Sequence, residues 1–438
     1  MKKSLFIFFC LLLSGLYLLS PEIARRRRSW VVSVSRAEYF RFLSEGRAPL
    51  DRLYRRGDEV ALVVNRLQMN ALDQAGIAVD ILCWDEYYGS RETRLTAADV
   101  HSGGINGIYH SYQETQELLQ ELCTRYPELT SLVTLGQSVE GREIWALKIS
   151  DQADREENEP NVYVTGCHHA REWISVEMPL EFARHLLDRY HEQARIRQLV
   201  DQAQLYIIPI LNPDGLEFSI HTYRMWRKNR RYLGDLVWGV DLNRNYSYAW
   251  GYDDAGSSPD PASEAYRGPV PFSEPEILIL RDYLYQHPPS GMLNFHNYSQ
   301  LILIPWGFTA EPPADYPEMF AMAAEMSDRI RAVNGRHYEF GSGATAIYPT
   351  NGDSDDWVYG TFGVPSFTIE LPPLEFENGH FFTSEDEIQK TSAEILPALM
   401  YFCEYVKDHF SPALQAPGDR RDLERDRKPG KINHDFLP

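Results

Sequence analysis

The pattern of apolar and polar positions predicts a small folded unit near the start of the chain. Between residues 29 and 82, short runs with alternating apolar positions and runs with helical spacing follow one another. They predict strands and helices at residues 29–35, 37–44, 59–64, 66–74 and 77–82. We therefore expect a small α/β module over residues 29–86. The polar stretch over residues 87–104, which includes Arg91 and Arg94, predicts a linker open to proteolysis.

From residue 105 onward, nearly all-apolar strands alternate with amphipathic helices. Strands are predicted at residues 132–135, 144–149, 161–165, 204–211, 292–295, 301–305 and 366–371. Helices are predicted at residues 111–125, 172–191, 274–286, 316–333 and 385–409, the first with Ser111 as its N-cap. Strands that are apolar throughout belong to a sheet covered on both faces. We expect a three-layer α/β/α sandwich with a mixed, mostly parallel sheet over residues 105–410.

The two ends of the chain have a different character from the folded units. Residues 1–28 combine a short positive start with an apolar run from Leu5 to Ser20, which is typical of a signal peptide. The arginines at 25–28 leave open a retained signal anchor, which would be the one membrane span. We expect removal of the signal and a secreted protein, extracellular or periplasmic. Residues 411–438 are predicted to form a disordered tail.

Composition narrows the possible functions. The 438 residues carry 43 Lys and Arg against 63 Asp and Glu, a net charge of −20, which argues against nucleic acid as a partner because phosphates need a basic surface. Apolar residues make up 43% of the chain, enough for a large core. The five cysteines form no CxxC pair or regular spacing, so neither a thiolate zinc site nor a disulfide framework is predicted. The expected state is a monomer.

The strongest chemical signal lies between Thr165 and Trp173, where an apolar strand gives way to a helix. His169 and Glu172 form an HxxE pair, which places an imidazole and a carboxylate on one turn. These are two of the three protein ligands of a catalytic zinc, although such a pair alone is more often a surface hydrogen bond. His296, at the end of an apolar strand, is the best placed third ligand. The alternatives are less well placed: His101, His110, His168, His185 and His191.

Other polar residues interrupt apolar surroundings. Arg224 and Arg227 flank aromatic positions, and Asp241, Asn243 and Arg244 form a short polar run. Arginine is suited to grip a carboxylate or an oxyanion, although each run alone is better interpreted as a surface salt-bridge face. Glu370 ends a hydrophobic strand, where a carboxylate is costly unless it is paired or acts as a general base. The sequence contains no HExxH, GxSxG, GxGxxG or P-loop motif.

Taken in order, these stretches resemble the zinc metallocarboxypeptidases of the carboxypeptidase A/B type. The resemblance covers roughly 300 residues, from Tyr109 to Phe410. It is carried by Tyr109-His110-Ser111-Tyr112, Glu140-Gly141-Arg142, His169-Ala170-Arg171-Glu172-Trp173-Ile174, Asn212-Pro213-Asp214-Gly215, Met225-Trp226-Arg227-Lys228, Gly239-Val240-Asp241-Leu242-Asn243-Arg244-Asn245, His296, Ile347-Tyr348, Asp355-Asp356-Trp357 and Glu370. No single piece is decisive, but the ordered set is specific.

The resemblance implies a role for each matching residue. It implies one Zn²⁺ per chain, held by His169, Glu172 and His296, with Asp241 orienting His169. Glu370 would act as the general base and Arg227 would polarise the scissile carbonyl, as the catalytic residues. The substrate, a peptide or protein C-terminus, would be bound by Asn243, Arg244, Tyr348, Asp355, Arg224 and Tyr298. The module at 29–86 corresponds in place to the inhibitory prosegment of the family.

Asp355 bears on specificity. In the resembling family this position lies at the base of the specificity pocket, and an acid there implies a preference for C-terminal Lys or Arg. Asp353 adds a second possible anion, and Gly343 leaves room in the pocket. The structural alternative is that Asp355 caps a short helix beginning at Asp356. A broad or neutral specificity, an amidase or murein peptidase on the same fold, and an inactive peptide-binding homologue stay open.

Overall fold

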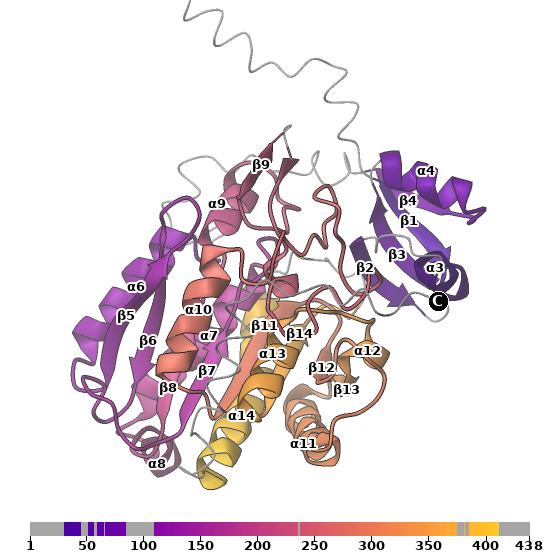
Figure 1. Ribbon diagram of the computed structural model, residues 1–438. Helices are drawn as coiled ribbons and strands as arrows, with labels where there is room; N and C mark the ends of the chain where they lie inside the picture. Colours follow the sequence, from indigo (N-terminus) through magenta and orange to yellow (C-terminus); the bar gives the residue numbers. More distant parts are fainter. Residues whose placement is uncertain are drawn as a thin grey trace, which may run out of the picture. The chain divides into compact units, whose positions relative to one another are not determined.

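The computed structural model of the protein describes residues 30–44, 51–56, 59–64, 66–84, 109–234, 237–374, 381 and 385–410. The predicted signal peptide, linker and C-terminal tail lie outside the described residues. Contacts along the chain separate it into two compact units, and each unit is described by itself (Figure 1). None of the helices in the described ranges has both the length and the hydropathy needed to cross a bilayer.

The smaller unit is an antiparallel sheet of four strands with two helices. Its elements are β1 (Trp30–Ser35), α3 (Arg36–Ser44), β2 (Asp51–Arg56), β3 (Glu59–Val64), α4 (Arg66–Gln74) and β4 (Asp80–Trp84). The strand order is β2-β3-β1-β4. Strand β2 was not expected from its sequence, which carries four charges and no apolar alternation, because an edge strand with a single neighbour needs little apolar surface. The strand expected at 77–82 begins only at Asp80.

The larger unit is built on a mixed sheet of eight strands. Its strands are β5 (Thr130–Gln137), β6 (Glu143–Ile149), β7 (Asn161–Thr165), β8 (Gln204–Ile208), β11 (Gly291–Asn297), β12 (Leu301–Ile304), β13 (Glu339–Ser342) and β14 (Ser366–Leu371). The order across the sheet is β13-β12-β14-β11-β7-β8-β6-β5. The four central strands β14, β11, β7 and β8 are parallel to one another. The expected mixed, mostly parallel sheet is therefore confirmed.

Helices cover both faces of this sheet. They are α6 (Tyr112–Arg125), α7 (Ile174–Arg189), α8 (Ala194–Val200), α9 (Pro213–His221), α10 (Pro275–Gln286), α11 (Tyr316–Asn334), α12 (Gly343–Ala346), α13 (Ser354–Phe362) and α14 (Glu385–Asp408). A 3₁₀ turn (Leu242–Arg244) and a small hairpin, β9 (Tyr232–Gly234) with β10 (Val237–Trp238), lie in the connections. The prediction of Ser111 as the N-cap of α6 is confirmed, and Ser111 also forms a capping box with Glu114.

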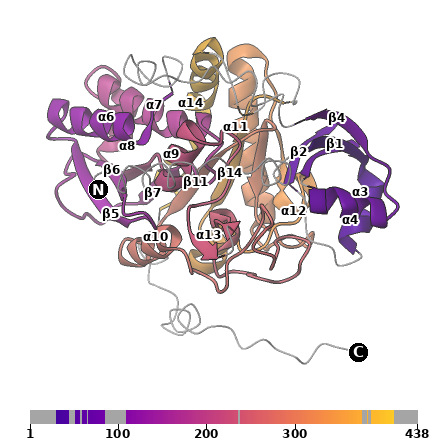
Figure 2. The same ribbon diagram turned by 90° about the horizontal axis from the view of Figure 1, so that it is seen from above.

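Alternation along the strands divides the apolar core into two layers. On β7, Val162 and Val164 pack into a cluster with α6, α7, α11 and α14, whereas Tyr163 packs into a second cluster with α10 and α13. Both views show the sheet between these two sets of helices (Figures 1 and 2). The expected three-layer α/β/α sandwich is confirmed.

The expected strand at 204–211 ends earlier, at Ile208, because Pro209 has no backbone N–H for the sheet. The short helices α8, α9, α12 and α13 were not predicted as helices of this length. In α9 the polar N-cap Asn212 and Pro213 at the first helical position indicate a helix start, whereas Gly215 two residues later reads as a helix breaker. The parallel strands bring their carboxyl ends together at one edge, where ligand sites in such sheets lie.

Candidate metal centre and its surroundings

Three side chains meet at the carboxyl edge of the central strands. His169 and Glu172 follow the end of β7, and His296 is the penultimate residue of β11. All three are buried, and one donor atom from each lies within 4.8 Å of the others. Glu370 on β14 is paired in parallel register with His296, so it lies at the same level of the sheet. The sheet order thus assembles residues that are 124 positions apart in the chain (172 to 296).

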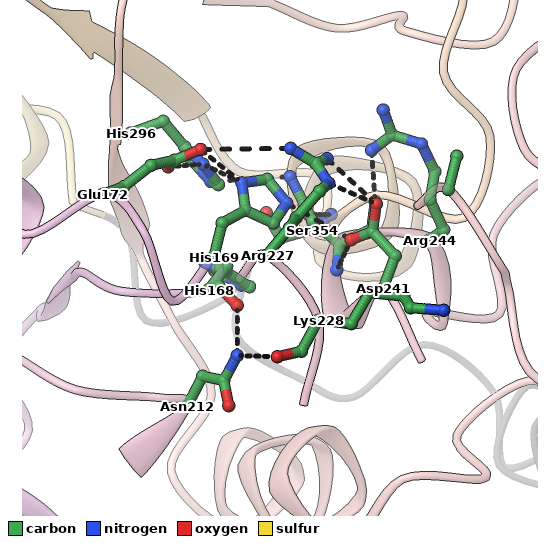
Figure 3. Close-up of polar contacts among 12 residues, drawn as sticks. His168, His169, Glu172, Asn212, Arg227, Lys228, Asp241, Arg244, His296 and Ser354 are labelled. Carbon is green, nitrogen blue, oxygen red and sulfur yellow. Dashed lines mark hydrogen bonds and ion pairs between the residues drawn. The ribbon is translucent and has the colours of Figure 1, made fainter. Parts of the chain in front are cut away.

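The donor atoms of the three residues face one another (Figure 3). Nδ1 of His169 lies 2.8 Å from Oε1 of Glu172, and Nδ1 of His296 lies 2.9 Å from Oε2. The two Nδ1 atoms are 3.1 Å apart. Burial alone would raise the pKa of Glu172, but His169 and His296 hold it well below its ordinary value. The carboxylate is therefore ionised.

The donor set fits a zinc ion. Ligand atoms on a tetrahedral ion with bonds of about 2.05 Å lie about 3.3 Å apart, close to the spacing of the two nitrogens. Two imidazole nitrogens that face each other at 3.1 Å share at most one proton, and a cation between them satisfies both lone pairs. A second acidic group, Asp151, Glu157 and Glu159, also lies within the distance for a shared ion. It is partly exposed and offers only oxygen, which does not match the nitrogen-containing set that zinc prefers.

Asp241 fixes the orientation of His169. Its carboxylate is fully buried, and Oδ1 lies 3.2 Å from Nε2 of His169 and accepts a hydrogen bond from the backbone N–H of Asn243 at 3.0 Å. Oδ2 accepts from Arg227, from Nε at 3.1 Å and from Nη2 at 2.9 Å. Burial would raise the pKa of Asp241, but Arg227 and His169 lower it well below its usual range. An ionised Asp241 keeps the proton of His169 on Nε2, which leaves Nδ1 free to bind a metal.

Arg227 is held in a fixed relation to the ligands by Asn212, the residue that caps α9. Nδ2 of Asn212 donates to the carbonyl of His168 at 3.0 Å and to that of Lys228 at 3.2 Å (Figure 3). The N–H of Ala170 donates to the carbonyl of Arg227 at 2.9 Å. The loop that carries Arg227 is therefore tied to the loop that carries His169, and Nη1 of Arg227 lies 3.9 Å from Glu172.

Asn243 and Arg244 lie on the turn after Asp241. Nδ2 of Asn243 is 3.5 Å from Nε2 of His296, and its Oδ1 accepts from the N–H of Ser354 at 2.9 Å. Arg244 donates from Nε to the carbonyl of Gly256 at 2.9 Å and from Nη1 to that of Asn243 at 2.6 Å. These bonds fix the plane of the guanidinium. Within the described ranges Nη2 of Arg244 has no acceptor, and its guanidinium lies 5.9 Å from the ring of Tyr348.

Glu370 carries a strongly perturbed carboxyl group. Burial raises its pKa to about 8; the neighbouring Glu172 adds to the rise, whereas His296 and Arg227 oppose it. In the part of the chain that the structure describes, no donor is hydrogen-bonded to this carboxylate. A divalent cation at the three ligands lowers the pKa of Glu370, since a nearby positive charge favours the ionised form. A carboxylate without hydrogen bonds beside a metal group has the properties of a general base.

Asp355 lies in the first turn of α13 and is buried. Its Oδ1 accepts hydrogen bonds from Nδ2 of Asn294 at 2.6 Å and from Oγ of Ser366 at 2.8 Å. Burial and then the charge of Asp353 raise the pKa of Asp355 to about 6, despite these bonds and one to Thr368. The alternative that Asp355 caps the helix is wrong. The N-cap is Asp353, whose side chain accepts from the N–H of Asp356 at 2.9 Å, because the helix begins at Ser354.

Three residues around Asp355 were not identified from the sequence. Asn294 on β11 and Ser366 and Thr368 on β14 supply its neutral donors, and Oδ1 of Asn294 accepts in turn from Thr165 at 2.6 Å. The sequence feature that could have identified these three residues is the presence of polar side chains at alternate positions of otherwise apolar strands. Which acid they face depends on the packing of α13 against the sheet, and no local pattern reports that.

His168 does not join its neighbour in the metal group. Its Nε2 lies 2.8 Å from the hydroxyl of Tyr246, and its ring is stacked on that of His296 with centroids 5.2 Å apart. Burial lowers the pKa of His168 well below its usual value, and His296 and His169 act in the same direction. The residue is therefore a neutral packing partner of the third ligand.

Arg224 and Tyr298 lie together near Phe381. Arg224 donates to the carbonyls of Arg171 and Phe381, both at 2.7 Å, and its guanidinium lies 3.5 Å from the ring centroid of Trp173. Burial lowers its pKa to about 9. The ring of Tyr298 is 5.2 Å from that of Phe381. The role of Arg224 and Tyr298 in binding substrate stays a prediction.

Comparison with known proteins provides independent evidence. Residues 115–398 match the sequence model of the zinc carboxypeptidase family. The chain is 36% identical over 309 residues to carboxypeptidase B of Astacus astacus, and the alignment covers 69% of this chain and 98% of that protein. It is 32% identical over 303 residues to carboxypeptidase A1 of Mus musculus, and this alignment covers 69% of this chain and 71% of that protein. The solved structure of carboxypeptidase A from Helicoverpa armigera is similar with a TM-score of 0.74 at 25% identity, covering 87% of this chain and 98% of that one.

Proposed function

The chain belongs to the zinc carboxypeptidase family, and we propose that within this family it is an exported enzyme that removes C-terminal Lys and Arg from peptides and proteins. Membership makes it a metallocarboxypeptidase of the A/B type, a hydrolase acting as an exopeptidase with one zinc ion. Relatives named carboxypeptidase B and carboxypeptidase A1 both match, so their names do not decide the preferred residue. The observation that carries the proposal is Asp355.

In the proposed mechanism, His169, Glu172 and His296 hold the zinc ion. Bound zinc supplies a Lewis acid that polarises oxygen atoms in contact with it and lowers the pKa of water there. Glu370 accepts the proton of the attacking water on a carboxylate oxygen and later donates it to the leaving amine nitrogen. Arg227, which Asp241 orients, donates to the carbonyl oxygen as negative charge develops on it; loss of such a donor typically costs about 3 kcal/mol.

Recognition of a free C-terminus is assigned to Arg244 and Asn243. The guanidinium of Arg244 is held by two backbone carbonyls, and its Nη2 keeps a donor for an incoming carboxylate. A fixed planar guanidinium is suited to a carboxylate ligand, and ordering it in advance lowers the entropy lost on binding. Tyr348 lies beside the guanidinium, where its ring covers the bound terminal residue. This pair makes the enzyme an exopeptidase.

Asp355 supports the preference for basic residues. Its carboxylate is buried and accepts hydrogen bonds from neutral donors, but in the described ranges it has no ion pair. A buried carboxylate without an opposite charge is costly, and the cation of a C-terminal Lys or Arg supplies that charge. A neutral terminal side chain leaves the cost in place. Specificity therefore follows from an unpaired anion.

The test is a panel of blocked dipeptides ending in Lys, Arg, Phe, Leu and Glu, assayed with and without a chelator. We expect chelator-sensitive activity with kcat/KM highest for Lys and Arg. In Asp355→Asn, which keeps the size of the side chain, kcat/KM for Lys falls about 100-fold while that for Leu changes little. The matched control is Asp282→Asn, an exposed aspartate paired with Arg281. Equal use of Lys and Leu by the wild type would overturn the proposed preference.

Export and activation form the second part of the proposal. We infer that residues 1–28 direct secretion and that the module at 29–86 inhibits until the linker is cut. The alignment with the Helicoverpa armigera enzyme covers 87% of this chain, which is more than the larger unit alone could account for. The alignment therefore also includes part of the smaller unit, and this supports the assignment of that unit as a prosegment. Limited trypsin treatment should raise activity, and the double variant Arg91→Gln/Arg94→Gln should respond less. Unchanged activity after confirmed cleavage of the linker contradicts the zymogen.

A further inference from the structure

We propose that Asp353 is a second specificity-determining residue, and that it makes the choice between basic and neutral C-terminal residues depend on pH. The inference rests on the proposed role of Asp355 in binding the terminal side chain. Asp353 acts on Asp355 through its charge: when both are ionised the pocket accepts Lys or Arg, and when Asp355 retains a proton the pocket accepts a neutral residue of similar length.

Three carboxylates lie within four positions at the start of α13. Asp353, Asp355 and Asp356 are 7%, 8% and 0% exposed. Asp353 accepts from Oγ1 of Thr350 and from the N–H of Asp356. Asp356 accepts from two backbone N–H groups, those of residues 307 and 308, at 2.8 and 3.1 Å. All these donors are neutral, and in the described part of the chain none of the three carboxylates forms an ion pair.

Among the described residues, Arg244 is the cation whose charge acts on Asp353. The charge of Arg244 lowers the pKa of Asp353, but its guanidinium donates to the carbonyls of Gly256 and Asn243 and not to a carboxylate. One cation cannot neutralise three buried anions. The cluster therefore retains at least one proton over part of the pH range in which the enzyme is folded.

Groups on the elements packed against α13 leave this conclusion unchanged. On β11 and β14 the residues that bond Asp355 are neutral, and the titratable groups of those strands, His296 and Glu370, make no hydrogen bond to it. Two tyrosines also face the cluster. Burial raises the pKa of Tyr246, with Asp355 and Asp353 adding to the rise, and Asp356 adds to that of Tyr248. Both tyrosines therefore stay neutral and cannot balance the acids.

The three acids differ in how firmly they hold a proton. Burial raises the pKa of Asp356 well above its usual value, and the charge of Asp353 adds to the rise. Burial also raises the pKa of Asp353. For Asp355 the value is about 6, and the charge of Asp353 is the largest cause after burial. Asp355 thus changes charge in the range where peptidases work, and Asp353 sets where that change falls.

Asp353 cannot move its charge away from Asp355. Its side chain is committed at both oxygens, to the cap of α13 through the N–H of Asp356 and to Thr350. The backbone of Gly307 closes the remaining side, since a Cβ there would lie 2.5 Å from Oδ2 of Asp353. A confined anion two positions from Asp355 repels it whenever both are ionised, and only a proton or a cationic substrate relieves the repulsion.

The test compares two blocked dipeptides that differ only in a terminal Lys or norleucine, between about pH 5 and about pH 8. The ratio of their kcat/KM values cancels pH effects on zinc and on Glu370. In the wild type the ratio rises about tenfold between pH 5 and pH 7, as expected for a group titrating near pH 6. In Asp353→Asn, where Asn also caps a helix well, the midpoint of the rise moves to lower pH. Asp353→Ser is a second capping variant without charge, and Asp282→Asn is the exposed control.

The outcomes separate the two proposals. A wild-type ratio that favours Lys but is flat with pH, or a midpoint that is the same in both Asp353 variants, overturns the inference and leaves the proposed function standing. A ratio near one at every pH, unchanged by Asp355→Asn, overturns the proposed preference itself. Zinc content and the midpoint of urea unfolding are measured first for each variant. If one of the two Asp353 variants fails to fold, the conclusion is taken from the other.

Discussion

Asp241→Asn is the variant that most directly tests how the protein prepares its metal ligands. Asp241 is fully buried, and its carboxylate bonds both His169 and Arg227. Asn keeps one oxygen for the N–H of Asn243 but replaces the other with an NH₂ group that faces the donors of Arg227. The change removes the buried negative charge, leaves the guanidinium without its bidentate partner and no longer fixes the proton of His169 on Nε2.

Two magnitudes follow from these contacts. Loss of a carboxylate that orients a metal-binding histidine typically weakens metal affinity about 10- to 100-fold, which is about 1.4 to 2.7 kcal/mol. Breaking a buried ion pair by removing one partner costs about 3 to 5 kcal/mol, because the other charge stays buried without compensation. We therefore expect Asp241→Asn to bind zinc at least tenfold more weakly and to lower the free energy of unfolding of the metal-free protein by about 3 kcal/mol or more.

The assay is a competition between the protein and a chromophoric chelator for zinc near neutral pH, together with urea unfolding of the metal-free protein. The control, Asp282→Asn, makes the same chemical change in an exposed pair with Arg281, which is worth about 0 to 1 kcal/mol. It should leave zinc affinity unchanged. If Asp241→Asn is folded and binds zinc within twofold of the wild type, Asp241 does not orient His169 and the argument is refuted.

Three further predictions concern other polar groups of the larger unit. Glu370→Gln should retain zinc but lower kcat about 10²- to 10⁴-fold, because it loses the group that moves the proton. Burial raises the pKa of Glu276 to about 7. The protonated form of Glu276 therefore contributes to the free energy of unfolding, and this contribution is complete below about pH 4. It is lost as the pH rises through 7, which lowers the free energy of unfolding by up to ~4 kcal/mol. In Glu276→Gln the free energy of unfolding should therefore fall less between pH 5 and pH 8 than in the wild type. Arg224→Met should destabilise the protein by about 2 to 4 kcal/mol in urea unfolding, since it removes hydrogen bonds to two buried carbonyls and the contact with Trp173.

Each of these predictions has an outcome that contradicts it. Full turnover by Glu370→Gln excludes its assignment as the base. An equal loss of stability with pH in Glu276→Gln and the wild type means that Glu276 does not carry the pH dependence. If Arg224→Met keeps wild-type stability but raises KM, Arg224 serves the substrate and not the fold.

Much of the architecture follows from local pattern. The all-apolar run 161–165 is a strand with those bounds, and Ser111 with Glu114 starts the first helix of the larger unit. The prediction failed where one residue overrides a pattern, as Pro209 does at the end of β8, and where an edge strand such as β2 carries no pattern to detect. Apolar alternation reports burial, and elements with little buried surface leave little trace of it.

The candidate site divides in the same way. His169 and Glu172 are three positions apart on one turn of the chain. The local backbone geometry therefore places them together in any fold that forms this turn. His296 and Glu370 reach them because β11 lies between β7 and β14 in the sheet, and that order results from the packing of both apolar layers. The ordered resemblance to a known family named these residues, but it did not supply the reason that they meet.

Local sequence pattern was enough to predict most strands of the larger unit, its larger helices and the residue types of a zinc-binding turn, because backbone geometry and burial act over a few neighbouring positions. The packing of α13 against the sheet is what shows which acid caps the helix, which neutral donors surround Asp355, and that Asp353 and Asp356 lie beside it with no ion pair among the described residues. Those facts depend on how a helix is placed against two strands, one of which supplies Asn294, 61 positions from Asp355. The free energy of that placement is summed over the whole core, and no short stretch of the chain contains it.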